Sequence, residues 1–308
     1  MNQKAFTPAR SGDALPRLSG LQTVRTESGL VSVAAQANKY LSALQSVLTK
    51  DESPRAQQPD AGEKTRLPNM RCEFPPKHPV PEHPTEWEFP SFLGGTPWID
   101  TLREVYAHPL AFPASISPEV GLLLYSLVRN IRPMTVVETG TFIAVSTIWI
   151  AAALKDNDDG GMLHTFDTFG PIRAGKHRDA ELLEGHLELV ADHIARAGVA
   201  EQVVLHKGNS HVELKRAQNH FQSRGGVQIA YLDADHTGPG VWNDLWTVEP
   251  VLNTGGYVLL HDTFPHLCSH QGPRNVMLNL DKAAGLYDAI DVYTAPMNYG
   301  VGILRRVG

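Results

Sequence analysis

The stretch Val227–Phe264, VQIAYLDADHTGPGVWNDLWTVEPVLNTGGYVLLHDTF, decides the fold. It opens with an apolar run that ends on acids, passes through a Gly-Pro-Gly turn into a segment with helical spacing, and closes with a second apolar run. Two short apolar runs joined by a helical segment are typical of a βαβ unit. Such a unit places its two strands parallel in one sheet, so the stretch predicts an α/β protein.

The same alternation of strand and helix extends on both sides of this stretch. Ser117, Pro118 and Glu119 have the residue types that favour a helix start, and Pro133 ends that helix. Residues 287–295 and 299–307 flank a Pro-Met-Asn turn and predict a terminal hairpin. We therefore predict a doubly wound, mostly parallel, seven-stranded α/β sheet of the Rossmann-like type, with an antiparallel C-terminal hairpin. The other expected strands cover residues 134–140, 162–169 and 202–209, and the expected helices cover 144–154, 181–199 and 212–224.

Residues 1–97 differ from the rest in composition, and we predict that they form an N-terminal extension to a domain over residues 98–308. Apolar residues recur at three- and four-residue intervals from about residue 30 to 48, which predicts an amphipathic helix. Residues 51–90 contain nine prolines and favour an extended tether, because proline fixes φ and lacks an amide hydrogen. Two interpretations of the helix stay open: it packs on its own domain, or it contacts a second subunit in a homo-oligomer.

The composition argues against several classes of protein. The net charge is −6 and the isoelectric point about 6.1, whereas general nucleic-acid or anionic-membrane binders carry a basic face. The longest apolar stretch, at residues 145–154, is too short to span a bilayer. The chain has only two cysteines, Cys72 and Cys268, and its first residues lack the apolar core of a secretion signal. We expect a cytoplasmic protein with free thiols.

Polar residues follow the expected strands, and open α/β sheets bind their ligands at those strand ends. Gly140 allows a tight turn after the first strand, but it stands alone there, so the three-glycine dinucleotide motif is not present. Glu138 beside it favours a cationic ligand. Asp167 ends the second strand, where an acid commonly binds a ribose diol, and Asn209 after the third suits an adenine edge. For each of these residues the alternative to a ligand-binding role is that of an ordinary turn residue or a solvated loop residue.

Acids and histidines gather at the ends of the next two expected strands. Asp233 ends one strand, and His261 and Asp262 end its neighbour. Carboxylates and an imidazole on adjacent strands are suitable ligands for a divalent cation, which we expect to be magnesium or manganese. The alternative is structural, with Asp235 capping the following helix and His261 hydrogen-bonded in the core. Asp233 with His236 alone leaves the choice open, and the addition of Asp262 on the neighbouring strand favours the interpretation as a site.

These motifs together resemble the class I S-adenosylmethionine-dependent methyltransferases. The resemblance covers about residues 98–308 and rests on ETGT at 138–141, HTFDTF at 164–169, DADH at 233–236, HD at 261–262 and the terminal hairpin. More narrowly, the chain is similar to metal-dependent O-methyltransferases that act on macrolide and aminocoumarin sugars, and to cephalosporin-hydroxylase-like proteins. The sugar-modifying relatives tend to carry an acid where this chain has His261.

The resemblance implies a Rossmann-like methyltransferase fold and methyl transfer from S-adenosylmethionine to a hydroxyl of a small molecule, expected to be a secondary metabolite. It further implies that Asp233 and Asp262 are metal ligands and that His236 is the general base, so the catalytic residues are His236 and Asp233. The implied cofactor-binding residues are Glu138, Gly140, Thr141 and Ser146 at the methionine part and Asp167 at the ribose, with Asn209 and Asp233 beside them.

Three other functions stay open. One is a non-catalytic scaffold that keeps the fold and binds a partner. Another is an NAD(P)-dependent oxidoreductase on a similar sheet, against which the missing glycines count. The third is a hydroxylase-associated role. Fold alone does not decide between them.

Overall fold

The structure, a computed structural model, describes residues 89–111, 114–175, 180–280, 286–292 and 299–308. The expected helix at 30–48, nearly all of the expected tether and Cys72 lie outside these residues, so the role of residues 1–97 stays a prediction. Cys268 is buried and has a free thiol. No helix in the described ranges is both long and apolar enough to cross a membrane.

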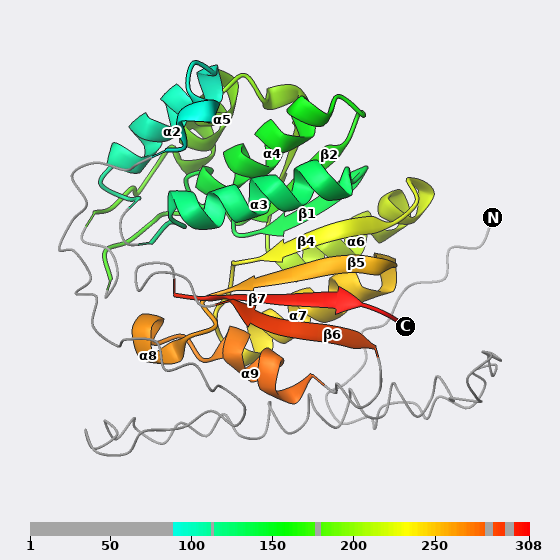
Figure 1. Cartoon of the computed structure of the whole chain (residues 1–308). Coiled ribbons are helices and arrows are strands. Elements are labelled where there is room, and N and C mark those ends of the chain that lie inside the picture. Colours follow the sequence, from blue (N-terminus) through cyan, green and yellow to red (C-terminus); the bar gives the residue numbers. More distant parts are fainter. Residues whose placement is uncertain (1–88, 112–113, 176–179, 281–285, 293–298) are drawn as a thin grey trace, which may run out of the picture. The chain divides into compact units, whose positions relative to one another are not determined.

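The sheet confirms the predicted fold. Within the described ranges it has seven strands in the order β3-β2-β1-β4-β5-β7-β6 (Figure 1). Strands β1 to β5 pair in parallel, and β7 runs antiparallel to both β5 and β6. The strands are β1 Thr135–Thr139, β2 Met162–Asp167, β3 Val203–Lys207, β4 Val227–Leu232, β5 Leu252–His261, β6 Tyr287–Val292 and β7 Val301–Arg306.

The strand order reverses between β1 and β4, which lie side by side in the middle of the sheet. Chain connections leave these two strands in opposite directions, and such a switch point opens a crevice at the carboxyl ends of the strands. Thr139 at the end of β1 pairs with Phe166 of β2 on one side and with Leu232 of β4 on the other. The residues that follow these three strands therefore begin side by side at one edge of the sheet.

Helices cover both faces of the sheet (Figure 1). Helix α4 lies at the centre of one layer and is buried along almost its whole length, because α2 and α3 pack against it and the sheet lies beneath it. A helix that is apolar on all sides is expected in such a place. One layer contains α2 Pro97–Ala107, α3 Pro118–Ile131, α4 Val145–Asn157 and α5 His186–Arg196, and the other contains α6 Ser210–Ser223, α7 Gly238–Val248 and α9 Gly272–Asn279. Shorter elements are α8 Pro265–Cys268 and the 3-10 turns η1 Ser91–Leu93, η2 Ala200–Gln202 and η3 Glu249–Val251.

Two expectations about helices were wrong in detail. Helix α5 begins at His186, five residues later than predicted, because Leu182 forms a bridge with Ile172 and Gly185 takes a left-handed φ of 74°. Helix α9 was not predicted. Ser117 does stand at the start of α3, but its hydroxyl hydrogen-bonds the Glu119 carboxylate and does not cap the helix backbone.

A histidine pair between β2 and β3 makes the stability of the fold depend on pH. His164 Nδ1 lies 3.0 Å from His206 Nε2 in a hydrogen bond, and the His220 ring lies 5.3 Å from that of His164. Burial, together with the charges of His206, His220 and Arg224, lowers the pKa of His164 to about 4. At this position the unfolded chain therefore binds more protons than the native chain between pH 6.5 and about 4, so the contribution of His164 to the free energy of unfolding falls as the pH falls through this window.

We expect His164→Gln to reduce this pH dependence, because glutamine keeps a hydrogen-bonding side chain but has no proton to gain. Urea denaturation at pH 7 and pH 5 measures the effect. The loss of unfolding free energy between the two pH values is expected to be smaller in the variant than in the parent protein. An equal loss in both proteins would show that His164 does not titrate as described.

Candidate active site

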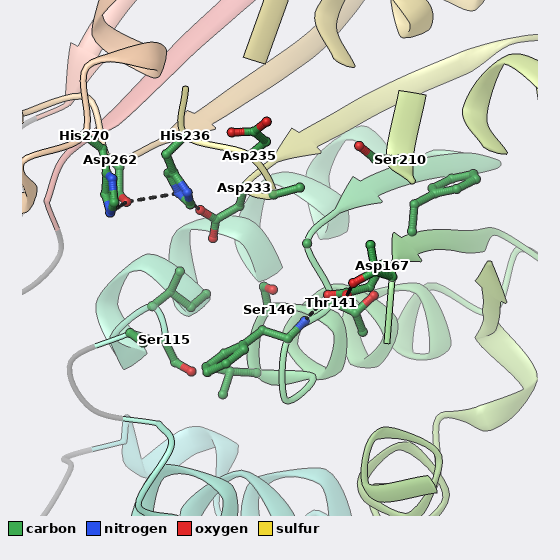
Figure 2. Close-up of a pocket in the computed structure, with 18 of the residues that line it drawn as sticks. Ser115, Thr141, Ser146, Asp167, Ser210, Asp233, Asp235, His236, Asp262 and His270 are labelled. Atoms are coloured by element: carbon green, nitrogen blue, oxygen red, sulfur yellow. Dashed lines mark hydrogen bonds and ion pairs between the residues drawn. The ribbon is translucent and has the colours of Figure 1, made fainter. Parts of the chain in front are cut away.

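A pocket of about 690 Å³ runs along the carboxyl ends of β2, β1, β4 and β5 (Figure 2). This volume lies within the range of about 300–1,000 Å³ that is usual for small-molecule sites. Asp167 is the last residue of β2 and lies at one end of the pocket, and Gly140 and Thr141 follow β1 in the middle. The other end is lined by residues that follow β4 and β5, among them Asp233 and Asp262. The pocket therefore joins the strand ends that the sequence singled out.

The turn after β1 requires glycine at position 140. Gly140 has a φ of 88°, and a Cβ atom there would lie 2.3 Å from the Asp233 carbonyl oxygen. The Gly140 amide donates to Phe166 O at 2.9 Å, and the Asp233 amide donates to Thr139 O at 2.9 Å. These contacts hold the loops after β1 and β4 against each other, so the floor of the pocket depends on the missing side chain.

Asp167 is held in a fixed orientation at its end of the pocket. Its Oδ2 accepts the Phe142 amide and its Oδ1 accepts the Phe169 amide, both at 3.0 Å. Oδ1 also accepts the Thr168 hydroxyl at 3.3 Å, whereas Oδ2 keeps a second acceptor position, so the side chain can still accept a hydroxyl group of a ligand. Asn209 and Ser210, at the start of α6, line the same end of the pocket.

Glu138 lies beneath the pocket and is not among the residues that line it. Its carboxylate accepts the hydroxyls of Ser146 and Thr147, each at 2.6 Å. Burial raises the pKa of Glu138 to about 7, against the opposing effect of these hydrogen bonds. The prediction of Glu138 as a lining residue is therefore corrected: it positions Ser146, which lines the pocket itself. Thr141 also lines the pocket, and its hydroxyl pairs with that of Thr165 at 2.6 Å.

Two aspartates and two histidines lie at the other end of the pocket (Figure 2), and the buried His261 lies against the same aspartates. His236 Nε2 lies 3.0 Å from Asp233 Oδ1 and 3.1 Å from Asp262 Oδ2. His261 Nδ1 lies 3.3 Å from Asp233 Oδ1 and 3.1 Å from Asp262 Oδ1. His270 Nε2 lies 3.7 Å from Asp262 Oδ2, and its ring stacks on that of His236. We refer to Asp233, His236, His261, Asp262 and His270 as the Asp/His cluster.

The carboxylates and imidazoles of the Asp/His cluster shift each other's pKa values. Burial alone would lower the pKa of His236, but hydrogen bonds to Asp233 and Asp262 outweigh burial and raise it to about 10. His261 is likewise buried, and the same two carboxylates raise its pKa well above 6.5. Burial raises the pKa of each aspartate, but the adjacent histidines outweigh it and hold both carboxyls below their usual range. Without a bound cation, the cluster is thus a set of ion pairs at neutral pH.

Neighbouring groups fix the aspartates of the cluster in place. The Tyr231 hydroxyl donates to Asp233 Oδ2 at 3.0 Å, so Asp233 presents its other oxygen to the histidines. Asp262 has a left-handed φ of 61°, which is costly for a residue other than glycine and occurs mainly at functional positions. Such support is typical of metal and catalytic sites, where partner groups orient the ligands.

Asp235 was expected to cap helix α7, but it does not. Its Oδ1 accepts the Thr237 amide at 2.9 Å, and the Thr237 hydroxyl is the cap, accepting the Gly240 amide at 3.1 Å. Asp235 forms a turn before the helix, and its side chain lines the pocket. The structural alternative for His261 also fails in part, because its Nε2 is buried and has no hydrogen-bond partner in the described part of the chain.

The ligand atoms of Asp233, His261 and Asp262 lie within 4.8 Å of one another, and so do those of His236, His270 and Asp262. A divalent cation about 2.1 Å from each ligand atom could bind such a group after small side-chain movements. The sequence pointed to the first group. It did not point to His270, nor to Ser115 and Tyr299, which line the pocket from loops without any periodic pattern.

Comparisons with known proteins agree with this fold. Residues 137–263 match the model of a family described as methyltransferase domain, and this segment contains the end of β1, the turn at Gly140, β4 and four of the five cluster residues. An O-methyltransferase from Bacillus cereus, solved in complex with SAH, is 20% identical, with a TM-score of 0.52 over 68% of this chain and 91% of that chain. A proposed O-methyltransferase from Klebsiella pneumoniae is 21% identical, with a TM-score of 0.50 over 70% of this chain and 92% of that chain. No curated protein matches the sequence at a significant level.

The family model agrees with the predicted methyltransferase class over residues 137–263, and the two solved structures share the fold. Residues 137–263 of this chain match a methyltransferase domain, within a Rossmann-like methyltransferase fold.

Proposed function

We propose that the protein transfers a methyl group from S-adenosylmethionine to a hydroxyl oxygen of a small molecule. One observation carries the proposal: a single pocket extends from Asp167, an acid suited to a ribose diol, to the Asp/His cluster, which contains a base and cation ligands. Asp233 connects the middle of the pocket with the Asp/His cluster, because its backbone packs on Gly140 and its side chain lies in the cluster. The relatives from Bacillus cereus and Klebsiella pneumoniae, described as O-methyltransferases, support transfer to oxygen.

Residues of this chain fit the parts of S-adenosylmethionine in order along the pocket. Asp167 accepts the ribose hydroxyls, and Asn209 lies where an adenine ring would continue from the ribose. Thr141 and Ser146 offer hydroxyls to the methionine part near the start of α4, a helix without a side-chain cap, whose first amides favour a carboxylate. When bound, the cofactor supplies an electrophilic methyl group, and the electrons of the broken carbon–sulfur bond return to sulfur as the oxygen–carbon bond forms.

His236 is the base in this proposal, and it can act as a base only when the charges of the adjacent carboxylates are offset. A base must be neutral, but Asp233 and Asp262 keep His236 protonated at neutral pH. A divalent cation at Asp233, His261 and Asp262 would offset these carboxylate charges and lower the pKa of an acceptor hydroxyl. His236 then accepts the hydroxyl proton at Nδ1, while its Nε2–H donates to Asp233 Oδ1 across the 3.0 Å contact and keeps the imidazole in place.

We assign the acceptor to the part of the pocket that Ser115, Ile116 and Tyr299 line. Ser115 and Ile116 precede α3 and Tyr299 precedes β7, and we refer to these three residues as the acceptor wall. The wall combines apolar and hydroxyl groups, as expected for an uncharged acceptor with several polar substituents. Because the oxygen, methyl carbon and sulfur must be collinear, a rigid wall contributes to the rate through positioning.

We expect Asp167→Ala to weaken the binding of S-adenosylhomocysteine at least about tenfold. The variant loses an acceptor for the ribose hydroxyls, and each hydrogen bond to a charged group contributes about 1.5–3 kcal/mol. It also releases the Phe142 amide. Calorimetric titration of parent and variant gives the two dissociation constants. Equal constants would place the ribose away from Asp167.

A turnover screen tests the proposed reaction. Full-length protein is incubated with S-adenosylmethionine and a panel of phenols, sugars, hydroxylated amino acids and matched amines, and the release of S-adenosylhomocysteine is measured. We expect turnover with a hydroxyl acceptor, and its loss when that hydroxyl is absent. Turnover only with amines would contradict transfer to oxygen. Cofactor binding without turnover on any class would favour a non-catalytic role.

A further inference from the structure

The Asp/His cluster contains more imidazole than a site for a hard cation requires. Of its five side chains, three are histidines, from the loops after β4 and β5 and from the end of β5 itself. Asp262 belongs to both groups of ligand atoms within 4.8 Å of one another, and each of these groups includes at least one imidazole nitrogen. Any cation bound by Asp262 together with two other cluster residues therefore has at least one nitrogen ligand.

Two buried side chains of the cluster, those of Asp262 and His261, suggest that a cation binds between them. Asp262 is 5% exposed and His261 is 4% exposed. Asp262 Oδ1 has no hydrogen bond of good geometry in the described part of the chain, and its 3.1 Å contact with His261 Nδ1 is an ion pair only while that histidine is protonated. Beside a neutral His261, this buried carboxylate oxygen would lack a partner, which is costly. A cation shared by Asp262 Oδ1, Asp233 Oδ1 and His261 Nδ1 would satisfy all three atoms.

The ligand types decide which cation fits. Magnesium prefers six oxygen ligands and gives up its water reluctantly, whereas imidazole suits iron, cobalt, nickel and zinc. We propose that Asp233, His261 and Asp262 bind a divalent transition metal in preference to Mg²⁺, and that His261 sets this preference. The inference deepens the proposed function and rests on it only for the role of the ion beside the acceptor oxygen.

The surroundings of His261 fit this role. His261 is the last residue of β5, pairs in the ladder with Val301 of β7 and so has a fixed backbone. Its Nδ1 lies between the two carboxylates, 3.3 Å from Asp233 and 3.1 Å from Asp262. No movement of the strand is needed for this nitrogen to become a ligand. His270 lies on the pocket side of Asp262, where a second imidazole would strengthen the same preference.

Metal competition on the full-length protein tests the inference. Metal-stripped protein is dialysed against Co²⁺ in the presence of about 100-fold more Mg²⁺, and bound metal is measured by mass spectrometry together with the visible absorption of Co²⁺. We expect about one equivalent of Co²⁺ to be retained, with the absorption of a nitrogen-ligated ion. Displacement of Co²⁺ by Mg²⁺, or retention of neither metal, would overturn the inference.

Variants assign the preference to a residue. His261→Asp is expected to bind Mg²⁺ more tightly and to lose the nitrogen-ligated Co²⁺ spectrum, because all three ligands are then carboxylates. His261→Gln, which adds no charge, is expected to lose the preference for Co²⁺ as well and serves if the aspartate variant does not fold. His220→Asp makes the same chemical change at an exposed position of α6 outside the cluster, and should bind Co²⁺ as the parent does. Unchanged Co²⁺ binding in His261→Gln would overturn the role of His261.

Titration of the same samples with S-adenosylhomocysteine separates this inference from the proposed function. Cofactor binding without retained metal would overturn the metal inference alone and leave methyl transfer in place. Retained Co²⁺ without cofactor binding would support the metal site and overturn the proposed reaction.

Discussion

His236→Gln is expected to lower kcat for methyl transfer by about 10²–10⁴-fold, the usual contribution of a positioned general base. The acceptor is the one identified by the turnover screen. Glutamine can still donate a hydrogen bond to Asp233 or Asp262, but it cannot accept the hydroxyl proton. The affinity for S-adenosylhomocysteine should change little, because His236 lies at the acceptor end of the pocket, opposite Asp167.

The control for this variant is its stability, since His236 pairs with two buried carboxylates. Removal of one partner from a buried ion pair can cost about 3–5 kcal/mol, although His261 still contacts both aspartates. Activity is therefore compared at a temperature where thermal denaturation shows both proteins folded. A folded variant with the parent kcat would exclude His236 as the base.

Gly140→Ala is expected to reduce the free energy of unfolding by about 3 kcal/mol or more, and to abolish cofactor binding in the protein that remains folded. Alanine at a φ of 88° is strained, and its Cβ would lie 2.3 Å from the Asp233 carbonyl oxygen. That oxygen belongs to the backbone, so relief requires the loops after β1 and β4 to separate. Urea denaturation and calorimetric titration with S-adenosylhomocysteine measure the two effects.

Gly160→Ala is the matched control. Gly160 has a φ of 74°, but a Cβ atom there meets nothing within 4 Å. The control isolates the backbone strain, which costs about 1–2 kcal/mol. If both variants lose the same stability, the contact between Gly140 and Asp233 contributes nothing.

The fold was predictable from sequence because each parallel strand is a short apolar run followed by a polar residue. A strand that is buried on both faces is a continuous apolar run, whereas the helices between strands have apolar residues at three- and four-residue intervals. Strand order was not predictable, because it depends on which edges pair after the chain crosses the sheet. The start of α5 was placed too early because Leu183 continues the apolar spacing of the helix, while the bridge between Leu182 and Ile172 is a tertiary contact.

The candidate site was predictable where its residues end or directly follow strands. Asp167 ends β2, Asp233 and Asp262 follow β4 and β5, and the parallel sheet brings them to one edge. Glu138 was misplaced because position within a strand does not show which side chains reach the pocket, and its carboxylate is used by Ser146 and Thr147. His270 follows a four-residue helix in a loop, and no local pattern connects it with Asp262.

Calorimetric titration of the full-length protein with S-adenosylhomocysteine, and separately with NAD⁺, tests the central claim most directly. We predict a dissociation constant in the micromolar range, on the order of −8 kcal/mol in binding free energy, for S-adenosylhomocysteine, and no heat from NAD⁺. The turn at Gly140 lacks the further glycines that close approach of a pyrophosphate requires. Binding of NAD⁺ without binding of S-adenosylhomocysteine would contradict the account.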